Sequence, residues 1–596
     1  MDIFLPLPTQ PRFHFQLTIY RLFLAVVSLL TFQSNCLSQE IGAYKTRASG
    51  DFNQFSTWQV WTGSAWVPAN QKPNSTTDIY IDQGHTLRLL GSESVKNLYL
   101  HAGAGAGQKL NLNNFNLDVY GILAAFSGPA PGQPRGAWNS QNWIGNSLNS
   151  TLTFKGESRV IVDKASWSAQ STQSRFGVIF DPGPGQELTI QAPFKALSFR
   201  IRSGVLYQKN DLNSSTSPCF TLSFNTETSL YGSGPFGTVT VEEGATFRSV
   251  CSAQVIHRTA ANPALLFDLQ RDATLLLEGQ EPKIEAANMT LEGSIVFRGN
   301  QGLMNFLSSQ LPSSSKPHVV RHLVVDGEAD VMLPNHLELQ GNLLQLGKGG
   351  FQLAATQLRL SGGENQSLQT KSLLLGSLIL HKSAGKVSLG SDLSIYRSLT
   401  MLEGVLDFQE HALTLNTSSL GNFHYQGGRW QHLRQLTYFG LPDLLTTNSG
   451  TFPFEDLYNG GFRGLQILGP TPLGSNLTIR FEEEAGANHD ANFQDVDGTE
   501  ILYQLHSHFQ LSLSPRLGLQ ELELRISADS LLLDQGADLR IVSRGKAAPG
   551  LSIPSGIDGF PWAKRRLKWS ELNEVELTIG SYREATVLPL LKKNRN

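Results

Sequence analysis

An internal repeat constrains the fold of this chain more than any other feature of its sequence. Two stretches carry matching apolar residues at an offset of 55 or 56 positions. Inside each copy the apolar residues come in pairs two apart, between short turns of Gly, Asn, Ser or Asp. A period of two predicts strands with one buried face. The first copy holds Leu323, Val325, Val331, Leu333, Leu337, Leu339, Leu343, Phe351, Leu353, Leu358 and Leu360, and the second holds Leu378, Leu380, Val387, Leu389, Leu393, Ile395, Leu399, Leu406, Phe408, Leu413 and Leu415.

Short strands that repeat at a fixed length predict an all-β chain built as a right-handed parallel β-helix, a solenoid in which stacked turns bury a continuous apolar column. At about 20 residues per turn, one repeat unit spans two or three turns. Leucine-rich repeats are the rival, but their L-x-x-L-x-L-x-x-N signature is absent. We expect the solenoid over 76–430, an N-terminal cap over 39–75, and longer loops near 126–147, 164–176 and 207–220.

A different pattern begins near residue 440, where the strands lengthen and the fixed repeat stops. This pattern predicts an antiparallel β-sandwich over 440–585, followed by a short basic tail over 586–596. We expect Trp562 and Trp569 to be packing anchors of the sandwich. Its predicted strands are Leu477 to Phe481, Phe509 to Leu513, Leu522 to Ile526, Leu539 to Val542 and Val575 to Ile579.

The N-terminus predicts export. An apolar run of 11 residues, Leu22 to Phe32, is too short to span a membrane and follows Arg12 and Arg21, as in a secretory signal peptide. We place the signal at 1–38 and expect no transmembrane segment after it. Lipidation of Cys36 is an alternative.

Cysteine use leaves one question open. Cys36 would leave with the signal, whereas Cys219 and Cys251 remain. In an oxidising compartment these two can form a disulfide. The alternative is that each is a small buried apolar side chain.

Charge and composition limit the partners of the chain. The net charge is −3, from 47 basic and 50 acidic residues among 596. Nucleic-acid binding needs a basic face, so no nucleic-acid partner is expected. A partner, if there is one, is a cell-surface glycan or a protein, and no cofactor is expected.

Several motifs resemble one group of proteins. The opening Arg47-Ala48-Ser49-Gly50-Asp51-Phe52, the run Ser56-Thr57-Trp58, and the repeat elements Gly385-Lys386-Val387 and Gly404-Val405-Leu406-Asp407 are similar to secreted β-solenoid repeat proteins of Bacteroidota-type bacteria. The segments Phe452-Pro453-Phe454 and Leu577-Thr578-Ile579-Gly580-Ser581 resemble the sandwich module that follows in that family.

The resemblance implies an adhesin-like protein that is secreted or held at the outer cell surface. Members usually continue into a C-terminal sorting domain for type IX secretion, whereas this sequence stops at Asn596. If the sorting domain is truly missing, the expected location is periplasmic.

Enzyme chemistry is the main alternative, because parallel β-helices also host polysaccharide lyases and hydrolases. Such sites need carboxylates gathered on one ladder, and the outward positions of the clearest repeats are mostly Ser, Gln, Asn, Thr, Lys and Arg. We therefore expect an exported, non-enzymatic surface, structural or adhesin-like protein, with no catalytic or metal site. A carbohydrate-active protein that binds or cleaves a glycan is the alternative.

Tryptophans supply the only candidate ligand contacts. Trp138 and Trp143 stand in a predicted loop rich in Gly, Pro and Asn, and we name them as possible glycan contacts because aromatic faces stack on sugars. Trp58, Trp61 and Trp66 are interpreted as part of the cap, since terminal turns must cover the apolar column.

Two polar clusters are interpreted as structural. The acidic run from Glu482 to Glu500 contains Asp495 and Asp497 and is expected to be a solvated loop. His506 and His508 are expected to share one face of a strand.

Overall fold

The fold is described from a computed structural model, in two compact units: one holds residues 1–179 and 190–197, and the other holds 180–189 and 198–596. The described residues are 40–102, 108–126, 138–139, 143–145, 149–156, 162–163, 165–168, 176–190, 194–209, 222–224, 237–252, 254–257, 264–307, 318–416, 423–515, 518–531, 539–554, 561–572 and 574–581. Within these ranges the chain is strand and turn, with short 3-10 turns at Phe55–Thr57 and Trp569–Glu571 as its helical pieces.

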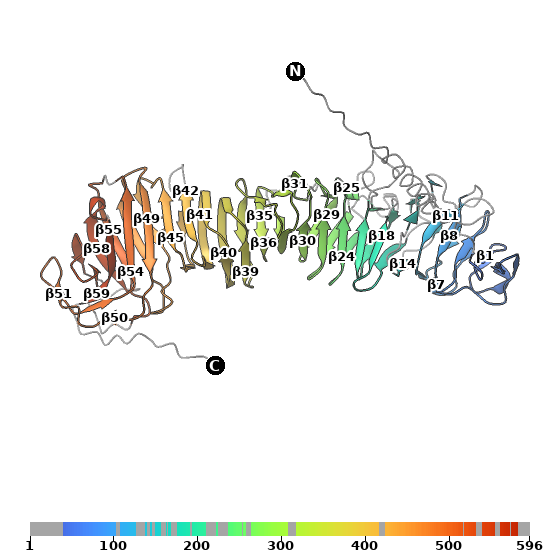
Figure 1. The fold of residues 1–596 in the computed structure, drawn as a ribbon, viewed down its shortest axis with the longest axis horizontal. Coiled ribbons are helices and arrows are strands. Elements are labelled where there is room, and N and C mark those ends of the chain that lie inside the picture. The colour runs from blue at the N-terminus through green and yellow to red at the C-terminus, as the bar shows by residue number, and fades with distance from the viewer. Residues whose placement is uncertain are drawn as a thin grey trace, which may run out of the picture. The chain divides into compact units, whose positions relative to one another are not determined.

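The first unit is a parallel ladder with an antiparallel hairpin at its start (Figure 1). The ladder runs through β1 (Tyr44–Thr46), β5 (Ile79–Ile81), β8 (Leu98–His101) and β11 (Leu123–Phe126). On the other side of β1, β3 (Trp58–Trp61) and β4 (Trp66–Pro68) pair antiparallel.

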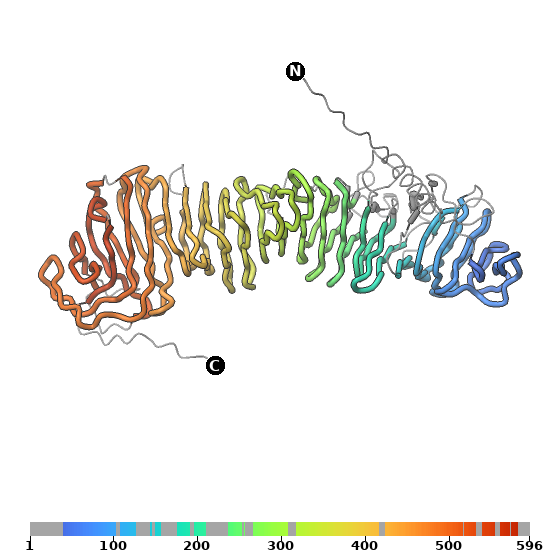
Figure 2. The backbone as a smooth tube through the Cα atoms, in the orientation of Figure 1, coloured from blue at the N-terminus to red at the C-terminus, as the bar shows by residue number. Residues whose placement is uncertain are grey.

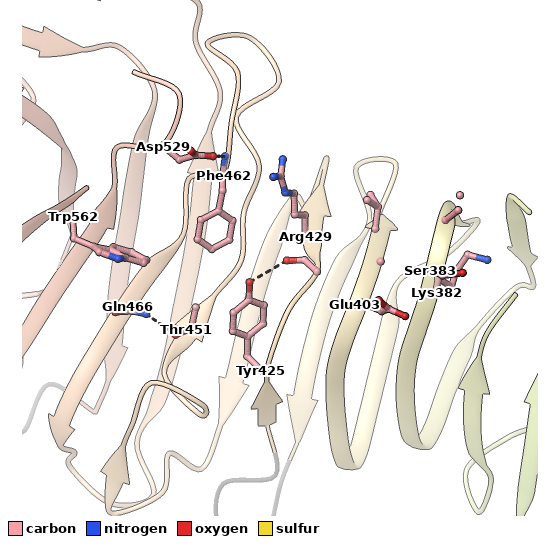
Figure 3. Close-up of a pocket in the computed structure, with 15 residues that line it drawn as sticks. Lys382, Ser383, Glu403, Tyr425, Arg429, Thr451, Phe462, Gln466, Asp529 and Trp562 are labelled. Atoms are coloured by element: carbon pink, nitrogen blue, oxygen red, sulfur yellow. Dashed lines mark hydrogen bonds between the residues drawn. The ribbon is translucent and has the colours of Figure 1, made fainter. Parts of the chain in front are cut away.

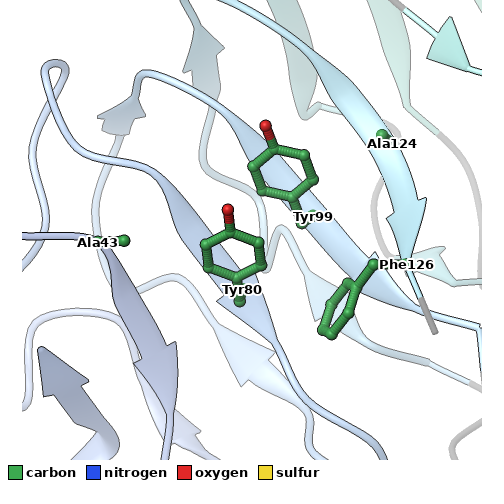
Figure 4. Close-up of a cluster of buried hydrophobic side chains, with 5 residues drawn as sticks. All are labelled: Ala43, Tyr80, Tyr99, Ala124 and Phe126. Atoms are coloured by element: carbon green, nitrogen blue, oxygen red, sulfur yellow. The ribbon is translucent and has the colours of Figure 1, made fainter. Parts of the chain in front are cut away.

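Both faces of this ladder are buried. Ile79 and Ile81 face one side, and Tyr80, which alternates with them, is also buried. Its ring stacks on Tyr99 with centroids 4.5 Å apart, and Phe126 meets it edge-on at 5.5 Å (Figure 4). Burial raises the pKa of Tyr80, which keeps its hydroxyl neutral.

The second unit contains the regular solenoid, and Figure 2 shows its coils stacked turn upon turn. One parallel ladder runs through β33 (His322–Val325), β36 (Leu343–Gln345), β39 (Gln366–Gln369) and β40 (Leu373–Leu389). A second runs through β35 (His336–Leu339), β38 (Gln357–Leu360), β40 and β41 (Leu393–Asp407). The predicted parallel β-solenoid is therefore confirmed.

The sequence repeat is not a whole number of turns. Leu378 lies 20 residues after its partner Leu358 and 21 before its partner Leu399. Leu323, the sequence match of Leu378, belongs instead to the ladder of Leu343. An offset of 55 therefore relates strands on different faces. Each face of the solenoid is built from the same pattern, an alternating strand followed by a short loop. Strands on different faces therefore resemble one another in sequence as much as strands stacked on the same face do.

The pairing switches direction at β45 (Gln435–Phe439). This strand pairs parallel with β42 (Ala412–Asn416) on one side and antiparallel with β49 (Asn476–Glu482) on the other. In this ladder the last solenoid strand is thereby paired with the antiparallel part of the chain, and its edge is covered.

Two larger antiparallel sheets and a small two-stranded one, Phe493–Gln494 with Glu500–Ile501, lie in this C-terminal part. β54 (His508–Ser514), β59 (Val575–Ser581) and β56 (Leu539–Ser543) extend the sheet of β49, and a second sheet contains β48 (Leu465–Pro470), β55 (Glu521–Ser527) and β58 (Trp562–Lys568). Five of these strands coincide with the predicted ones to within two residues at each end. Trp569 is fully buried, and its indole N–H donates to the carbonyl of Pro470 at 2.7 Å.

Candidate functional site

The second unit contains an open groove of about 730 Å³. We call it the junction groove, because the last solenoid turns form one side and the antiparallel part forms the other (Figure 3). Its solenoid side consists of Lys382 to Gly385, Glu403 to Val405, Tyr425, Gly428 and Arg429, and its other side of Thr451, Phe462, Gln466, Asp529 and Trp562.

A strip of glycines forms the solenoid side of the groove. Gly385, Gly404 and Gly428 each precede residues that pair in register on three neighbouring turns. Their φ angles are +69°, +110° and +96°, in the region that disfavours other residues. A Cβ at Gly428 would lie 2.7 Å from the carbonyl oxygen of Gly404. The bend therefore requires glycine, and the strip carries no side chains.

Three half-buried aromatic rings line the groove: Tyr425 on the side of the glycine strip, and Phe462 and Trp562 on the opposite side. Phe462 and Trp562 meet edge-on, with centroids 6.3 Å apart. Tyr425 lies on the solenoid side and donates from its hydroxyl to the carbonyl of Gly428 at 3.2 Å (Figure 3). The groove thus combines aromatic surface with exposed backbone.

Polar groups of the groove are held by specific bonds. Lys382 is buried, and its ammonium donates to the carbonyls of Gly362 at 3.0 Å and Glu364 at 2.7 Å. Burial lowers the pKa of Lys382. Asp529 accepts from the backbone N–H of Phe462 at 3.0 Å. These bonds fix the polar atoms before any ligand arrives.

Buried arginines support the aromatic side. Arg463, next to Phe462, is buried 3.5 Å from Asp456 and donates to the carbonyl of Ser527 at 2.8 Å. Arg565, on the same strand as Trp562, forms two bonds with Asp495 and also donates to the carbonyl of Ile541. Charge-assisted bonds of this kind hold the arginine side chains in place and so help to position the segments that carry Phe462 and Trp562.

We expected Trp562 to be a packing anchor of the sandwich core, and the structure corrects this. Its side chain lines the junction groove. Ala563, Arg565 and Leu567 on β58 are buried, and Trp562 belongs to the alternate, more exposed set. The period of two along this strand was the signal that could have separated Trp562 from the buried Trp569.

The structure bears on only one of the two predicted glycan contacts. Trp143 is 8% exposed, and the ammonium of Lys109 lies 4.9 Å from the centre of a Trp143 ring. Trp138 belongs to β12 (Trp138–Asn139), and its side chain lies outside the described residues. Glycan contact at these two residues stays a prediction, and neither lines the junction groove.

The tryptophans near the N-terminus lie in the hairpin of the first unit. Trp58 is fully buried, and its indole N–H donates to the carbonyl of Phe52 at 2.8 Å. Trp61 and Trp66 are partly buried, with ring centroids 5.4 Å apart. They pack against the buried cluster of Tyr80 and Tyr99.

The acidic run is not simply a solvated loop, which corrects a second expectation. Asp495 is buried against Arg565 and Arg540, and Asp497 is bonded to Arg540 at 2.6 Å. These arginines hold the pKa of both carboxyl groups below the usual range, to about 2 for Asp497. The charges of Asp495 and Asp497 are balanced by arginines more than 40 positions away in sequence.

The two histidines do not share a strand, which is a third correction. His508 begins β54, whereas His506 lies in the bend before it. Nδ1 of His508 lies 3.1 Å from the carbonyl oxygen of His506, to which it donates when it carries the proton, so His508 Nδ1 faces its own backbone.

Other sequence questions have partial answers. Cys251 is buried and disulfide-bonded, while Cys36 and Cys219 lie outside the described residues. Among the residues that the structure covers, no three His, Cys, Asp or Glu side chains form a metal-binding group. No helix in those same ranges has the length and apolar character of a membrane span.

Comparison with known proteins adds no assignment. No protein-family model matches the chain, and neither the curated proteins nor the solved structures contain a significant match.

Proposed function

We propose that this chain is an exported, non-enzymatic, adhesin-like β-solenoid protein that binds a glycan segment in the junction groove. The supporting observation is the strip of three glycines beside the rings of Tyr425, Phe462 and Trp562. The resemblance of the sequence to secreted solenoid proteins supports export and a place at the cell surface.

The groove has the chemistry that sugar rings require. A sugar presents apolar C–H faces, which pack on aromatic rings, and hydroxyl groups at its edge, which need polar partners. Arg429, Gln466 and Asp529 supply donors and acceptors along the rim. The strip without side chains leaves room for a chain of several sugar units to cross neighbouring turns.

Binding to immobilised polysaccharides tests the proposal. The purified chain is passed over a panel of glycans, and the retained glycan is then titrated against variants. Trp562→Ala is expected to weaken binding by about tenfold or more, because it removes the largest ring of the groove. Trp66→Ala, which removes a partly buried Trp in the first unit, is the matched control and should leave affinity unchanged.

A third variant separates this groove from the sequence-based candidates. If Trp138→Ala abolishes retention and Trp562→Ala does not, the glycan site lies at Trp138 and the junction groove is not the site. Retention on no glycan would contradict glycan binding and would leave a structural or protein-binding role. Release of shortened sugars from the panel would contradict the non-enzymatic reading.

A further inference from the structure

The junction groove crosses successive strands of the second unit. On its solenoid side Val405 pairs with Lys386 on one neighbouring strand and with Arg429 on the other. Arg429 is bonded to Glu455, whose backbone pairs in turn with Phe462 on the other side of the groove. Figure 3 shows the labelled lining residues following one another in this order, from the solenoid turns to the antiparallel strands. The long axis of the groove therefore runs along the stack of strands and not along a single strand.

The solenoid side of the groove has the spacing of a regular ladder. Gly385, Gly404 and Gly428 precede three residues that pair in one register, so one glycine follows the next at each turn. Neighbouring strands lie about 4.8 Å apart. A β-1,4-linked chain of sugars is an extended ribbon that advances by nearly the same distance with each unit. An α-1,4-linked chain curves into a helix and would leave a straight strip after a few units.

The aromatic residues offer one stacking face and one edge contact. The ring centroids of Phe462 and Trp562 are 6.3 Å apart and their planes meet at 89°, so a sugar ring that stacks on one of them meets the other from the side. Tyr425, on the opposite side, is held by its bond to the carbonyl of Gly428. Sugars whose hydroxyls are all equatorial have apolar C–H groups on both faces. A ribbon of such sugars can contact rings on both sides of the groove.

The charges among the lining residues cancel. The charged side chains of this lining are two cations and two anions, namely Lys382, Arg429, Glu403 and Asp529. Arg429 is bonded to Glu455 at 2.7 Å, and Glu403 lies 3.3 Å from Nε2 of His381. A charged group that leaves water without a counter-charge is destabilised, and this lining supplies no net counter-charge. The hydroxyls of a neutral glycan, in contrast, need only the donors and acceptors that are present.

We infer that the ligand of the junction groove is a neutral β-1,4-linked glycan, which lies along the glycine strip with about one sugar unit to each solenoid turn. The inference deepens the proposed function and rests on it. The glycan would stack one unit on the ring of Trp562 and extend past Gly428 and Gly404 toward Gly385. Ala384, which is exposed beside Gly385, marks the far end of this path.

Calorimetric titration of the full chain with hexasaccharides tests the linkage. Cellohexaose, xylohexaose and N-acetylchitohexaose are the neutral β-1,4-linked probes, and maltohexaose is the α-1,4-linked control matched to cellohexaose. At least one of the three probes should bind about tenfold or more tightly than maltohexaose. Affinity for that probe's sugar should rise from the disaccharide to about the pentasaccharide and then level off, because each unit crosses about one strand of the groove.

Charged glycans with the same linkage test the neutral class. Hexamannuronate carries a carboxylate on every unit, and chitosan hexaose carries an ammonium group on every unit. Both should bind about tenfold more weakly than the tightest neutral hexasaccharide, because the lining offers neither of them a net counter-charge. For the same reason, added salt should leave the affinity for the neutral hexasaccharide unchanged.

A bulky side chain at the far end of the strip tests the path of the glycan. Ala384→Phe adds a ring beside Gly385 at an exposed position. It should weaken the hexasaccharide by about tenfold and leave the disaccharide unchanged, because the disaccharide reaches only the aromatic end. Ala355→Phe, at an exposed alanine outside the groove, is the matched control and should change neither affinity. Melting curves of both variants confirm that they are folded.

Three results would overturn the inference and leave the proposed function in place, provided that Trp562→Ala still weakens binding. Maltohexaose that binds as tightly as the β-linked probes removes the extended ribbon from recognition. Tighter binding of hexamannuronate or chitosan hexaose makes the ligand a charged glycan. Unchanged hexasaccharide affinity in Ala384→Phe shows that the glycan does not follow the strip. Retention of no glycan, or binding that Trp562→Ala does not affect, contradicts the proposed function and this inference together.

Discussion

Arg565 and Asp495 form a fully buried bidentate pair, with N–H···O distances of 2.9 and 3.0 Å and side chains that are each 1% exposed. They lie 70 positions apart in the sequence and join the hairpin before β53 (Tyr503–Leu505) to β58. Arg540 adds a third bond to the same carboxylate at 3.1 Å. This network connects the two antiparallel sheets near the strand that carries Trp562.

Removing one partner of this pair should be strongly destabilising. Asp495→Ala leaves the Arg565 guanidinium buried without its counter-ion, which costs about 3–5 kcal/mol of unfolding free energy. Urea unfolding measures the loss. Asp497→Ala is the control, since Asp497 is 45% exposed and its removal should cost less than about 1 kcal/mol. Similar losses of unfolding free energy for both variants would show that burial of the Asp495–Arg565 pair does not make it more important for stability than the exposed Asp497.

The glycine strip makes a second prediction. In Gly404→Ala the new Cβ would meet Cβ of Lys382 at 2.9 Å, at a φ of +110°. Gly498→Ala has a similar φ of +81° but nothing within 4 Å. In both variants the positive φ costs an alanine about 1 kcal/mol of unfolding free energy, and only Gly404→Ala adds a steric clash. Thermal unfolding should therefore show a clearly larger loss for Gly404→Ala; equal losses would mean that the turns are not in close contact there.

Lys109 should make stability depend on alkaline pH. Within the described ranges its ammonium is buried without a hydrogen-bond acceptor, and burial lowers its pKa below the ordinary value of 10.5. The unfolded chain therefore binds the proton more tightly, and stability rises as pH increases toward 10.5. Lys109→Met should flatten that rise in melting curves taken between pH 7 and 10, whereas Lys348→Met, at an 81% exposed side chain, should not. An unchanged slope in Lys109→Met would contradict the desolvation of this lysine.

Glu483 should produce the opposite dependence at lower pH. Burial raises the pKa of its carboxyl group to about 7 in the folded chain, against an ordinary value of 4.5, so the folded state binds the proton more tightly. Stability from this group is therefore present below pH 4.5 and is lost as pH rises through 7. Glu483→Gln should reduce the decline between pH 5 and 8, as followed by melting temperature. A decline of the same size in Glu483→Gln would show that other groups cause it.

Local pattern predicted the strands of this protein well. Alternation along Leu477 to Phe481 and Leu522 to Ile526 is enough to indicate strands, and β49 and β55 contain those segments. The change from short repeating strands to longer ones also matches the switch from parallel to antiparallel pairing at β45. Alternation is a property of neighbouring residues, so it is readable without knowledge of the fold.

The alternating pattern could not predict which strands pair or which side chains meet at the site. The offset of 55 could not reveal that Leu378 stacks on Leu358 and not on the ladder of Leu323, because the faces of a turn carry the same alternation. The charges near Asp495 could not be balanced from sequence, because Arg540 and Arg565 arrive from distant strands.

By itself, the sequence determined that the chain is all β, that its strands bury one face, and that they stack as a solenoid followed by longer antiparallel strands. Tertiary structure alone decided which strands pair, where Gly385, Gly404 and Gly428 align into one strip, and which carboxylates are paired with arginines. The physical reason is that strand formation follows from short-range alternation and solvent exclusion, whereas a groove or a buried ion pair depends on distances between residues that only stacking brings together.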